Sequence, residues 1–289
     1  GYEYVFDNIP DKEVFDDIYT VKATVKDKAG NTSDRDYQFS VNRFGSTFML
    51  DDSSQAIAGK YISKPQDIII KEFNTDKHTG ENTVVITRDN EMQKLEEGKG
   101  FTIEESGGDN EWKEYTYIIP SEVFDADGRY TVSVHTTDEA GNINISASPK
   151  KQAELQFYVD KTEPLCIPLN ITDNGAYKGE SHIARLSVSD NIMLKNAEVY
   201  INGNLTDSEF TQDECVFNIP NSKHTQLIKV ILTDMAENKI EYVYKNILVT
   251  TNAVRFLAHK TWFRVAGGVT AAAAGAAVFF IRRRKKRSF

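Results

Sequence analysis

Residues 130–142 read Tyr-Thr-Val-Ser-Val-His-Thr-Thr-Asp-Glu-Ala-Gly-Asn, and residues 19–31 read Tyr-Thr-Val-Lys-Ala-Thr-Val-Lys-Asp-Lys-Ala-Gly-Asn. A weaker third copy, Ile-Lys-Val-Ile-Leu-Thr-Asp-Met-Ala-Glu-Asn, occupies residues 228–238. An Ile-Pro pair precedes each copy, at residues 9–10, 119–120 and 219–220. Two markers that recur in the same order indicate an internal repeat.

Each copy has the pattern of a β-hairpin. Apolar residues alternate with polar ones, so one face of the strand points inward; in the first copy this face carries Val21, Ala23 and Val25. The Asp-x-x-Gly-Asn that follows is typical of a turn, because Asp caps nearby amides while Gly and Asn tolerate positive φ. Glu237 replaces the Gly of the third turn, which predicts that this turn is strained or built differently. Return strands are predicted at residues 37–41, 155–159 and 242–244.

The copies are spaced like whole domains. Asp27 and Asp138 are 111 residues apart, and Asp138 and Asp234 are 96 apart. Short stretches rich in Val, Ile, Thr and Tyr, separated by Gly, Asn and Asp, favour β-sandwiches. The sequence therefore predicts an all-β chain of tandem domains with brief, semi-rigid boundaries. Its predicted parts are the last strands of a truncated domain at 1–44, a complete sandwich at 45–160 and a shorter one at 161–250.

The repeated motifs resemble those of a known group. Tyr-Thr-Val followed by Asp-x-Ala-Gly-Asn, and Phe-x-Val-Asp-Lys-Thr-x-Pro at residues 157–164, resemble the bacterial immunoglobulin-like (Ig-like) repeats of large cell-surface proteins. The resemblance covers residues 1–250. It implies tandem Ig-like β-sandwiches in which Tyr19 and Tyr130 take the corner position near the start of strand F. Val21 and Val132 stand where the core Cys of that fold would be, which implies sheets held together by apolar packing.

An apolar segment follows the repeats. Residues 265–281 carry no charge, and six consecutive cations follow at 282–287. A helix of 17 residues is about 25 Å long, near the lower limit for a bilayer span. Because cations are retained in the cytoplasm, the sequence predicts a single-pass cell-membrane protein whose N-terminal side is extracellular. Its predicted parts are a juxtamembrane linker at 251–264, a C-terminal transmembrane α-helix at 265–281 that contacts the lipid bilayer, and a basic cytoplasmic tail at 282–289.

The competing interpretation of residues 265–281 is a soluble Ala-rich helix or a loose apolar tail, but only Thr270 interrupts the apolar surface. No Leu-Pro-x-Thr-Gly sorting signal stands between residues 245 and 264, so retention in the membrane is the more economical prediction. The chain starts at Gly1 without a signal peptide, although the predicted orientation requires export. This predicts the C-terminal fragment of a longer exported protein.

The charge distribution limits which classes of partner the chain can bind. The chain has 34 Lys and Arg against 43 Asp and Glu, a formal net charge of −9. Six of the cations lie in the terminal tail and all of the acids precede it, so residues 1–281 carry −15. A surface this acidic, without a basic patch, argues against nucleic-acid binding, which requires cations to neutralise phosphates.

Two groups of acidic residues invite a metal interpretation. Asp27, Asp138 and Asp234 recur at the ends of strands and would suit calcium at domain junctions. One Asp and one Asn are too few ligands, so capped turns are favoured. The stretch 125–128, Asp-Ala-Asp-Gly, lacks the third acid and the distal Glu of a calcium loop and is also predicted to be a turn. The sequence therefore predicts no metal, cofactor or catalytic residue.

The remaining candidates are few. Cys166 and Cys215 fit either a disulfide or two buried thiols, and sequence alone does not decide between them. The histidines are scattered, and no hydrolase, zinc or phosphate-binding motif occurs; His135 is predicted to be solvated on an outer face. Tyr115 and Tyr117 share a strand face with Ile119 and are predicted to be core residues, whereas Trp112 has the opposite parity and is a candidate for stacking on a sugar.

Three functions are compatible with these patterns. The first is a non-catalytic, membrane-anchored stalk of Ig-like domains that presents an upstream region of a bacterial surface protein. The second is an adhesin whose Ig-like domains bind a glycan or a host protein. The third is the anchor of a surface enzyme whose catalytic domain lies upstream. The first is the prediction of the sequence, and within this chain no enzyme is predicted.

Overall fold

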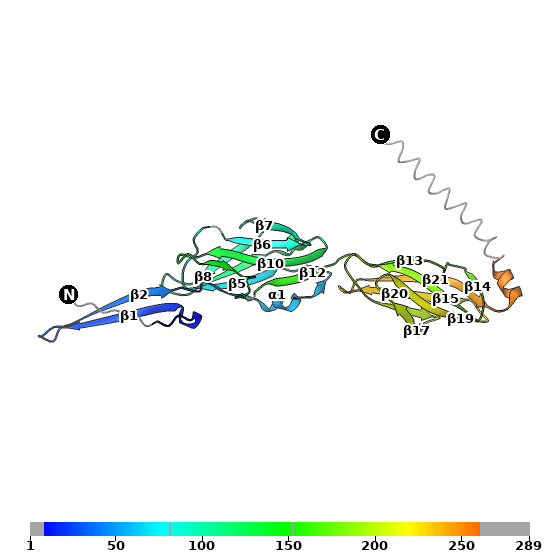
Figure 1. Cartoon of the computed structure of the whole chain (residues 1–289), viewed down its shortest axis with the longest axis horizontal. Coiled ribbons are helices and arrows are strands. Elements are labelled where there is room, and N and C mark those ends of the chain that lie inside the picture. Colours follow the sequence, from blue (N-terminus) through cyan, green and yellow to red (C-terminus); the bar gives the residue numbers. More distant parts are fainter. Residues whose placement is uncertain (1–8, 81, 152, 261–289) are drawn as a thin grey trace, which may run out of the picture. The chain divides into compact units, whose positions relative to one another are not determined.

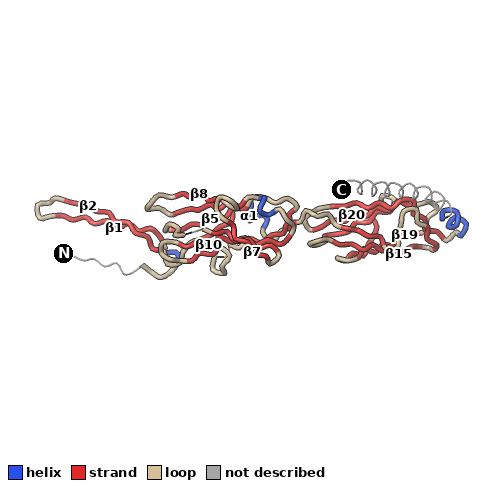
Figure 2. The backbone as a smooth tube through the Cα atoms, turned by 90° about the horizontal axis from the view of Figure 1, so that it is seen from above, coloured by secondary structure: helices blue, strands red, loops and turns tan. Residues whose placement is uncertain are grey.

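The computed structural model describes residues 9–260 apart from residues 81 and 152. The chain falls into two compact units, residues 1–161 and residues 162–289 (Figure 1). Strands form nearly all of the regular structure in both units (Figure 2). The all-β class predicted from the alternating pattern is confirmed.

The first unit begins with a hairpin and continues into a sandwich. The hairpin consists of the 3-10 helix η1 (Glu13–Phe15) and strands β1 (Asp17–Lys26) and β2 (Thr32–Val41). The sandwich also holds one short helix, α1, and a 3-10 helix, η2. Its elements are β3 (Thr47–Leu50), α1 (Asp52–Ile57), β4 (Tyr61–Ile62), β5 (Ile68–Asn74), β6 (Thr83–Arg88), β7 (Glu91–Leu95), β8 (Thr102–Ser106), β9 (Lys113–Ile119), η2 (Ser121–Phe124), β10 (Gly128–Thr137), β11 (Ile143–Ile145) and β12 (Leu155–Val159).

The sheet order of this sandwich is that of an Ig domain. One sheet has the order β3-β5-β9-β8, and the other has the order β4-β12-β10-β6-β7 with β11 paired to β10. Named by their sequence order, these are the A-B-E-D and A′-G-F-C-C′ sheets of the Ig fold. Inward-facing residues of both sheets form one buried core, which includes Ile68, Ile70, Tyr117, Val132, Val134 and Phe157. Burial of each such side chain contributes about 1.5–3 kcal/mol, so apolar packing joins the sheets.

The second unit repeats this order. Its sheets run β13-β15-β19-β18 and β14-β21-β20-β16-β17, which are again A-B-E-D and A′-G-F-C-C′. Leu186, Phe217, Val230 and Leu232 lie in its core. Its strands are β13 (Leu165–Pro168), β14 (Ala176–Lys178), β15 (Ser181–Ser189), β16 (Leu194–Ile201), β17 (Asn204–Thr206), β18 (Ser208–Phe210), β19 (Glu214–Pro220), β20 (Gln226–Asp234) and β21 (Lys239–Thr250).

The predicted corner tyrosines are confirmed. The Tyr130 hydroxyl donates to the Ala126 carbonyl at 2.9 Å, and the Tyr19 hydroxyl donates to the Phe15 carbonyl at 2.8 Å. Each bond fixes the turn that leads into the F-type strand. The matching position in the second unit is Gln226, whose Nε2 donates to the Pro220 carbonyl at 2.9 Å. The amide of Gln226 therefore takes the place of the Tyr130 phenol, and it still donates to a carbonyl earlier in the chain.

The two cysteines are free and buried. Cys166 on β13 lies opposite Val188 of β15, while Cys215 on β19 lies opposite Leu186 of the same β15. They are two strands apart in one sheet, about 9–10 Å at the usual strand spacing, and a disulfide requires Cα atoms within about 7 Å. Of the two alternatives left open by the sequence, the structure therefore has the buried thiols. Burial raises the pKa of both, to about 11 for Cys215.

This geometry predicts the thiol chemistry. Because the thiolate is the reactive form, neither cysteine should react quickly with Ellman's reagent in the folded chain. After unfolding in guanidinium without reductant, both should react. A denatured chain that yields fewer than two thiols would contain the disulfide that this register excludes.

The C-terminal end of the described chain is helical. Residues 253–260 form a helix, and the Asn252 side chain accepts a hydrogen bond from the Arg255 backbone N–H at 3.0 Å, as an N-cap does. In the described part of the chain, no helix has both the length and the apolar character needed to cross a bilayer. The predicted transmembrane helix at 265–281 and the tail at 282–289 lie outside the described residues.

A candidate functional site at the polar pole of the first sandwich

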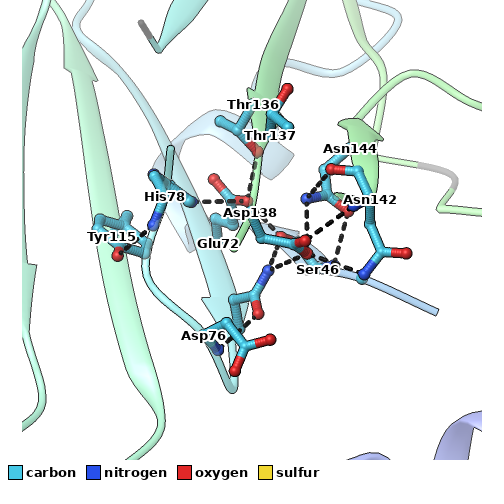
Figure 3. Close-up of polar contacts among 12 residues, drawn as sticks. Ser46, Glu72, Asp76, His78, Tyr115, Thr136, Thr137, Asp138, Asn142 and Asn144 are labelled. Atoms are coloured by element: carbon cyan, nitrogen blue, oxygen red, sulfur yellow. Dashed lines mark hydrogen bonds and ion pairs between the residues drawn. The ribbon is translucent and has the colours of Figure 1, made fainter. Parts of the chain in front are cut away.

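The polar pole is the end of the first sandwich where the hairpin joins it, and Asp138 lies at its centre (Figure 3). Asp138 follows β10 and is 1% exposed. Its Oδ1 accepts the Asn142 backbone N–H at 2.9 Å. Its Oδ2 accepts side-chain amides from four asparagines: Asn42 at 2.9 Å, Asn74 at 3.0 Å, Asn142 at 3.0 Å and Asn144 at 3.4 Å. One carboxylate thus organises amides from the hairpin end, β5, the turn and β11.

Glu72 is the second buried carboxylate of the pole. It lies on the inward face of β5 and is 0% exposed. Tyr117 donates to its Oε2 at 2.6 Å, Thr136 donates to its Oε1 at 2.8 Å, and the Ser46 hydroxyl also donates to Oε1. His78 Nε2 lies 3.1 Å from Oε1. Every one of these contacts crosses between elements, so Glu72 ties β5, β9, β10 and the loop after β5 together.

His78 is held in place by an aromatic ring. Its ring stacks on Tyr115 with centroids 3.7 Å apart, and its side chain is 5% exposed. The backbone N–H of His78 donates to the Tyr115 hydroxyl at 3.3 Å. Burial raises the pKa of Tyr115 to about 12, so this phenol stays neutral beside the carboxylates. The imidazole is therefore positioned against Glu72 by stacking rather than left in solvent.

Hydrogen bonds keep both carboxylates ionised despite their burial. Burial would raise the pKa of Asp138, but hydrogen bonds from Asn74 and Asn142 outweigh it and hold the pKa below its usual value. Burial would also raise the pKa of Glu72, but the hydrogen bond and charge of His78 lower it further than burial raises it, with help from Ser46 and Tyr117. Buried charges that are hydrogen-bonded in this way fix one arrangement of the side chains at the pole. The stability of that arrangement is sensitive to the loss of any member of the network.

Asn42 connects the hairpin to this network. Its Nδ2 lies within hydrogen-bond distance of Asn74 Oδ1 at 2.8 Å, Asp76 Oδ2 at 2.9 Å and Asp138 Oδ2 at 2.9 Å. Its carbonyl accepts the Asn142 side-chain amide at 3.1 Å. The residue after β2 is therefore bonded into the core end of the sandwich through both its side chain and its backbone.

Hydrogen bonds also fix the backbone of the residues that follow Asn42, at 43–46. The buried Asp16 carboxylate accepts the backbone N–H groups of Arg43 at 2.7 Å and Phe44 at 2.8 Å. Gly45 has a φ of +72°, and a Cβ there would lie 2.1 Å from Asn144 Oδ1. Gly45 is thus required for the close approach that lets the Ser46 N–H donate to Asn144 at 2.8 Å. The boundary at 43–45 is short and bonded on both sides.

The three repeated Asp turns share one set of hydrogen bonds. The side chains of Asp27, Asp138 and Asp234 each accept the backbone N–H and the side-chain amide of the Asn four residues later, at 2.7–3.0 Å. Glu237 adopts a φ of +68° where Gly30 and Gly141 have +94° and +85°. The third turn is therefore built like the others and carries a non-Gly residue in the left-handed region, a strain of about 1–2 kcal/mol.

Asp234 differs from Asp138 in its surroundings. It is buried at the end of β20 in the second unit, and burial, together with the nearby charge of Asp190, raises its pKa. The hydrogen bonds from Asn238 and Ala236 reduce this rise without removing it. The surroundings of this turn position therefore lower the pKa of the Asp in the first unit and raise it in the second.

A pair of substitutions tests that contrast. Asp234→Asn should leave the unfolding transition of the second unit unchanged at neutral pH or raise its midpoint, because a charge that the fold disfavours is removed. Asp138→Asn should lower the midpoint of the first unit, because its new amide donors face the donors of Asn42, Asn74 and Asn144. Chemical denaturation followed by hydrogen exchange resolves the two units. Thermal melts with and without EDTA test the calcium interpretation. The capped turns predict an unchanged melting temperature, and a drop of several degrees on adding EDTA would contradict them.

The other predicted candidates occupy ordinary structural positions. Tyr115 and Tyr117 are core residues, as predicted. Trp112 is 43% exposed, but its indole N–H donates to Asp17 at 2.8 Å and so belongs partly to the hairpin contact. The stretch 125–128 leads into β10, and Asp127 accepts the Lys161 N–H at 2.9 Å. His135 is half-buried rather than solvated: Ser133 Oγ lies 2.8 Å from its Nε2, and burial lowers its pKa.

Comparison with known proteins agrees with the Ig-like fold. Residues 7–43 match the family model described as Bacterial Ig-like domain. A solved structure of fibronectin(III)-like modules of CbhA from Clostridium thermocellum has 17% identity and a TM-score of 0.32, over 71% of this chain and 94% of that one. A search of the curated proteins finds no match. Both sandwiches have the strand order of the Ig fold, and the family match covers the hairpin of the first unit.

Proposed function

We propose that this chain is the non-catalytic stalk of a bacterial surface protein, anchored in the cell membrane through residues 265–281 and extending Ig-like domains outward. The observation that supports it best is the polar pole, where half-buried hydrogen bonds from Asn42 to Asp138 and Asn74 take the place of a flexible linker. A spacer has to keep its domains in a fixed arrangement. The hydrogen-bonded boundary between the hairpin and the sandwich resists bending more than a flexible linker does. The acidic character of residues 1–281 suits a surface that does not adsorb to anionic lipid.

The anchor proposal rests on the apolar residues 265–281 and the cations 282–287. The test is to fuse the full chain to an export signal, add an epitope after Phe289 and treat intact bacterial cells with protease. The sandwiches should be digested while the epitope is protected until the cells are lysed, and carbonate should not extract the protein. Digestion of the epitope from outside, or release by carbonate, would refute the anchor.

Two alternatives differ in what the domains contact. In the adhesin alternative, a glycan or protein binds the sandwiches, and the half-exposed Trp112 is a candidate for stacking on a sugar. A glycan array and a host-protein pull-down with the full chain should give no specific signal if the chain is a spacer. A signal that Trp112→Ala abolishes would favour adhesion. In the enzyme-anchor alternative the catalytic domain lies elsewhere, so this chain alone should have no hydrolytic activity.

A further inference from the structure

The helix at residues 253–260 is attached to one end of the second sandwich (orange in Figure 1). β21 stops at Thr250, and the N-cap Asn252 follows almost at once. Arg255 Nη1 donates to the carbonyl of Lys223, in the loop between β19 and β20, at 3.2 Å. The helix therefore lies at the end of the sandwich where β21 stops.

This end of the sandwich is basic. The backbone N–H groups of Gly179 and Ser222 donate to the carbonyls of the last two residues of β21, at 3.1 Å and 3.0 Å, which holds their loops beside the helix. We call residues 178–180, 220–224 and 250–260 the basic end. It carries one acid and four exposed cations: Glu180, Lys178, Lys223, Arg255 and Lys260.

The opposite end of this sandwich is acidic. β20 and β21 are antiparallel, so the turn between them, which carries Asp234 and Glu237, lies away from Thr250. Asp190 lies beside Asp234, with carboxylate oxygens within 4.8 Å of each other. No acid follows Glu241 in the sequence. Although residues 1–281 as a whole are acidic, a negatively charged surface would therefore attract the basic end and repel the acidic end.

The helix of the basic end also exposes apolar side chains. Val254 is 76% and Leu257 is 60% exposed. With the exposed Ala258 they have the i, i+3, i+4 spacing of one helix face. Phe256 and His259 are partly buried and belong to the side of the helix that is turned toward the protein. An exposed apolar face beside Lys and Arg is typical of a helix that lies in the headgroup region of a bilayer.

The proposed membrane span begins close to this helix. If residues 265–281 cross the bilayer, only residues 261–264 separate the span from Lys260, and four extended residues reach at most about 14 Å. Charges at a surface act over about 8 Å at physiological ionic strength. The anchor would therefore keep the basic end within one or two such lengths of the lipid headgroups.

We propose that the basic end of the second sandwich rests on the surface of an anionic bilayer, with Val254 and Leu257 in the headgroup region and Arg255 and Lys260 beside lipid phosphates. Each cation held at such a surface strengthens binding about fivefold. The inference rests on the proposed anchor. It adds that the bilayer contacts the sandwich itself and so fixes the tilt of this sandwich on the membrane.

Quenching of a fluorescent label by lipid tests the proposal. The full chain with Leu257→Cys is labelled with the dye NBD and reconstituted into phosphatidylcholine vesicles with or without phosphatidylglycerol, while the buried Cys166 and Cys215 stay unlabelled. A nitroxide on the lipid headgroups should quench this label about threefold more strongly in the anionic vesicles, because a docked helix lies within the headgroup region. The matched control is Leu165→Cys, which is 51% exposed and lies opposite Ser189 near the acidic end. Its label should not be quenched in either kind of vesicle.

Charge reversal tests the electrostatic part. Arg255→Glu with Lys260→Glu should abolish the difference between the two kinds of vesicle. Lys195→Glu with Lys239→Glu, which changes the same number of charges at the acidic end, should leave the difference in place.

Carbonate extraction of the same vesicles reports the anchor separately. If the vesicles retain the chain but the label at position 257 is quenched no more than the label at 165, the docking is wrong and the anchor stands. Equal quenching at position 257 with and without phosphatidylglycerol would also overturn the docking. So would a dimer in detergent that Leu257→Asp dissociates, since a second copy would then cover the helix. Release of the chain by carbonate would overturn the anchor and the docking together.

Discussion

Asp138→Ala should lower the free energy of unfolding of residues 45–160 by about 3–5 kcal/mol, because it leaves buried donors without their shared acceptor. Four side-chain amides and one backbone N–H bond to this carboxylate, and the site has no access to bulk water at 1% exposure. The hairpin should also loosen, since Asn42 loses one of its partners. Urea denaturation with intrinsic fluorescence gives the stability, and hydrogen exchange at residues 39–44 reports the loosening.

The matched control is Asp27→Ala. Asp27 has the same place in the same turn and makes the same bonds to Asn31, but it is exposed. Water can satisfy the groups that it leaves, so the loss should be far smaller and confined to the tip of the hairpin. Equal losses for the two variants would mean that the turn itself, rather than the buried network, carries the stability.

Acid should weaken the first unit more than the second. The folded-state pKa values of Glu72 and Asp138 lie below their usual values of 4.5 and 3.8. The stability that they contribute is therefore complete above these usual values and is lost as the pH falls through the lower folded values. Each unit of difference between the folded and unfolded pKa corresponds to about 1.4 kcal/mol. Asp234 acts in the opposite direction, because its raised pKa favours folding as protons bind.

The measurement is the urea midpoint of each unit between pH 7 and pH 2.5, followed by hydrogen exchange. The midpoint of the first unit should fall steeply below about pH 4.5, and Glu72→Gln should flatten that fall while lowering the midpoint at neutral pH. Thr136→Val is a useful companion, since it removes one donor to Glu72 without changing the charge. A midpoint that is independent of pH in the parent would show that the buried carboxylates are not ionised as described.

Much of the fold follows from local pattern. Alternation in residues 130–137 and the Asp-x-x-Gly-Asn turn define a hairpin within a few residues, and three copies of it define the repeat. The corner hydrogen bond of Tyr130 is local too, since it joins residues four positions apart. Such features need no knowledge of distant contacts, which is why the sequence predicts them.

The sequence does not predict the polar pole, because the contacts that form it join residues far apart in the chain. Asn42 and Asn74 bond to Asp138 across 96 and 64 positions, and Thr136 bonds to Glu72 across 64. By residue type alone, Asn42, Glu72 and Asn74 look like surface residues. Alternation along β5 is the one local signal of the pole. The parity that makes Ile68 and Ile70 core residues also points Glu72 and Asn74 inward. His78 gave no such signal, because its burial depends on stacking with Tyr115 from another strand.

If the polar pole holds the hairpin and the first sandwich as one stiff body, the distance between β1 and η2 should be fixed. Nitroxide labels at Lys22→Cys and Glu122→Cys place one probe on β1 and one on η2, while the buried Cys166 and Cys215 stay unlabelled. Double electron–electron resonance then gives the distribution of distances between the probes. We expect a single narrow distribution that broadens when Asp138→Ala is added. A broad distribution in the parent, or a width that Asp138→Ala leaves unchanged, would contradict it.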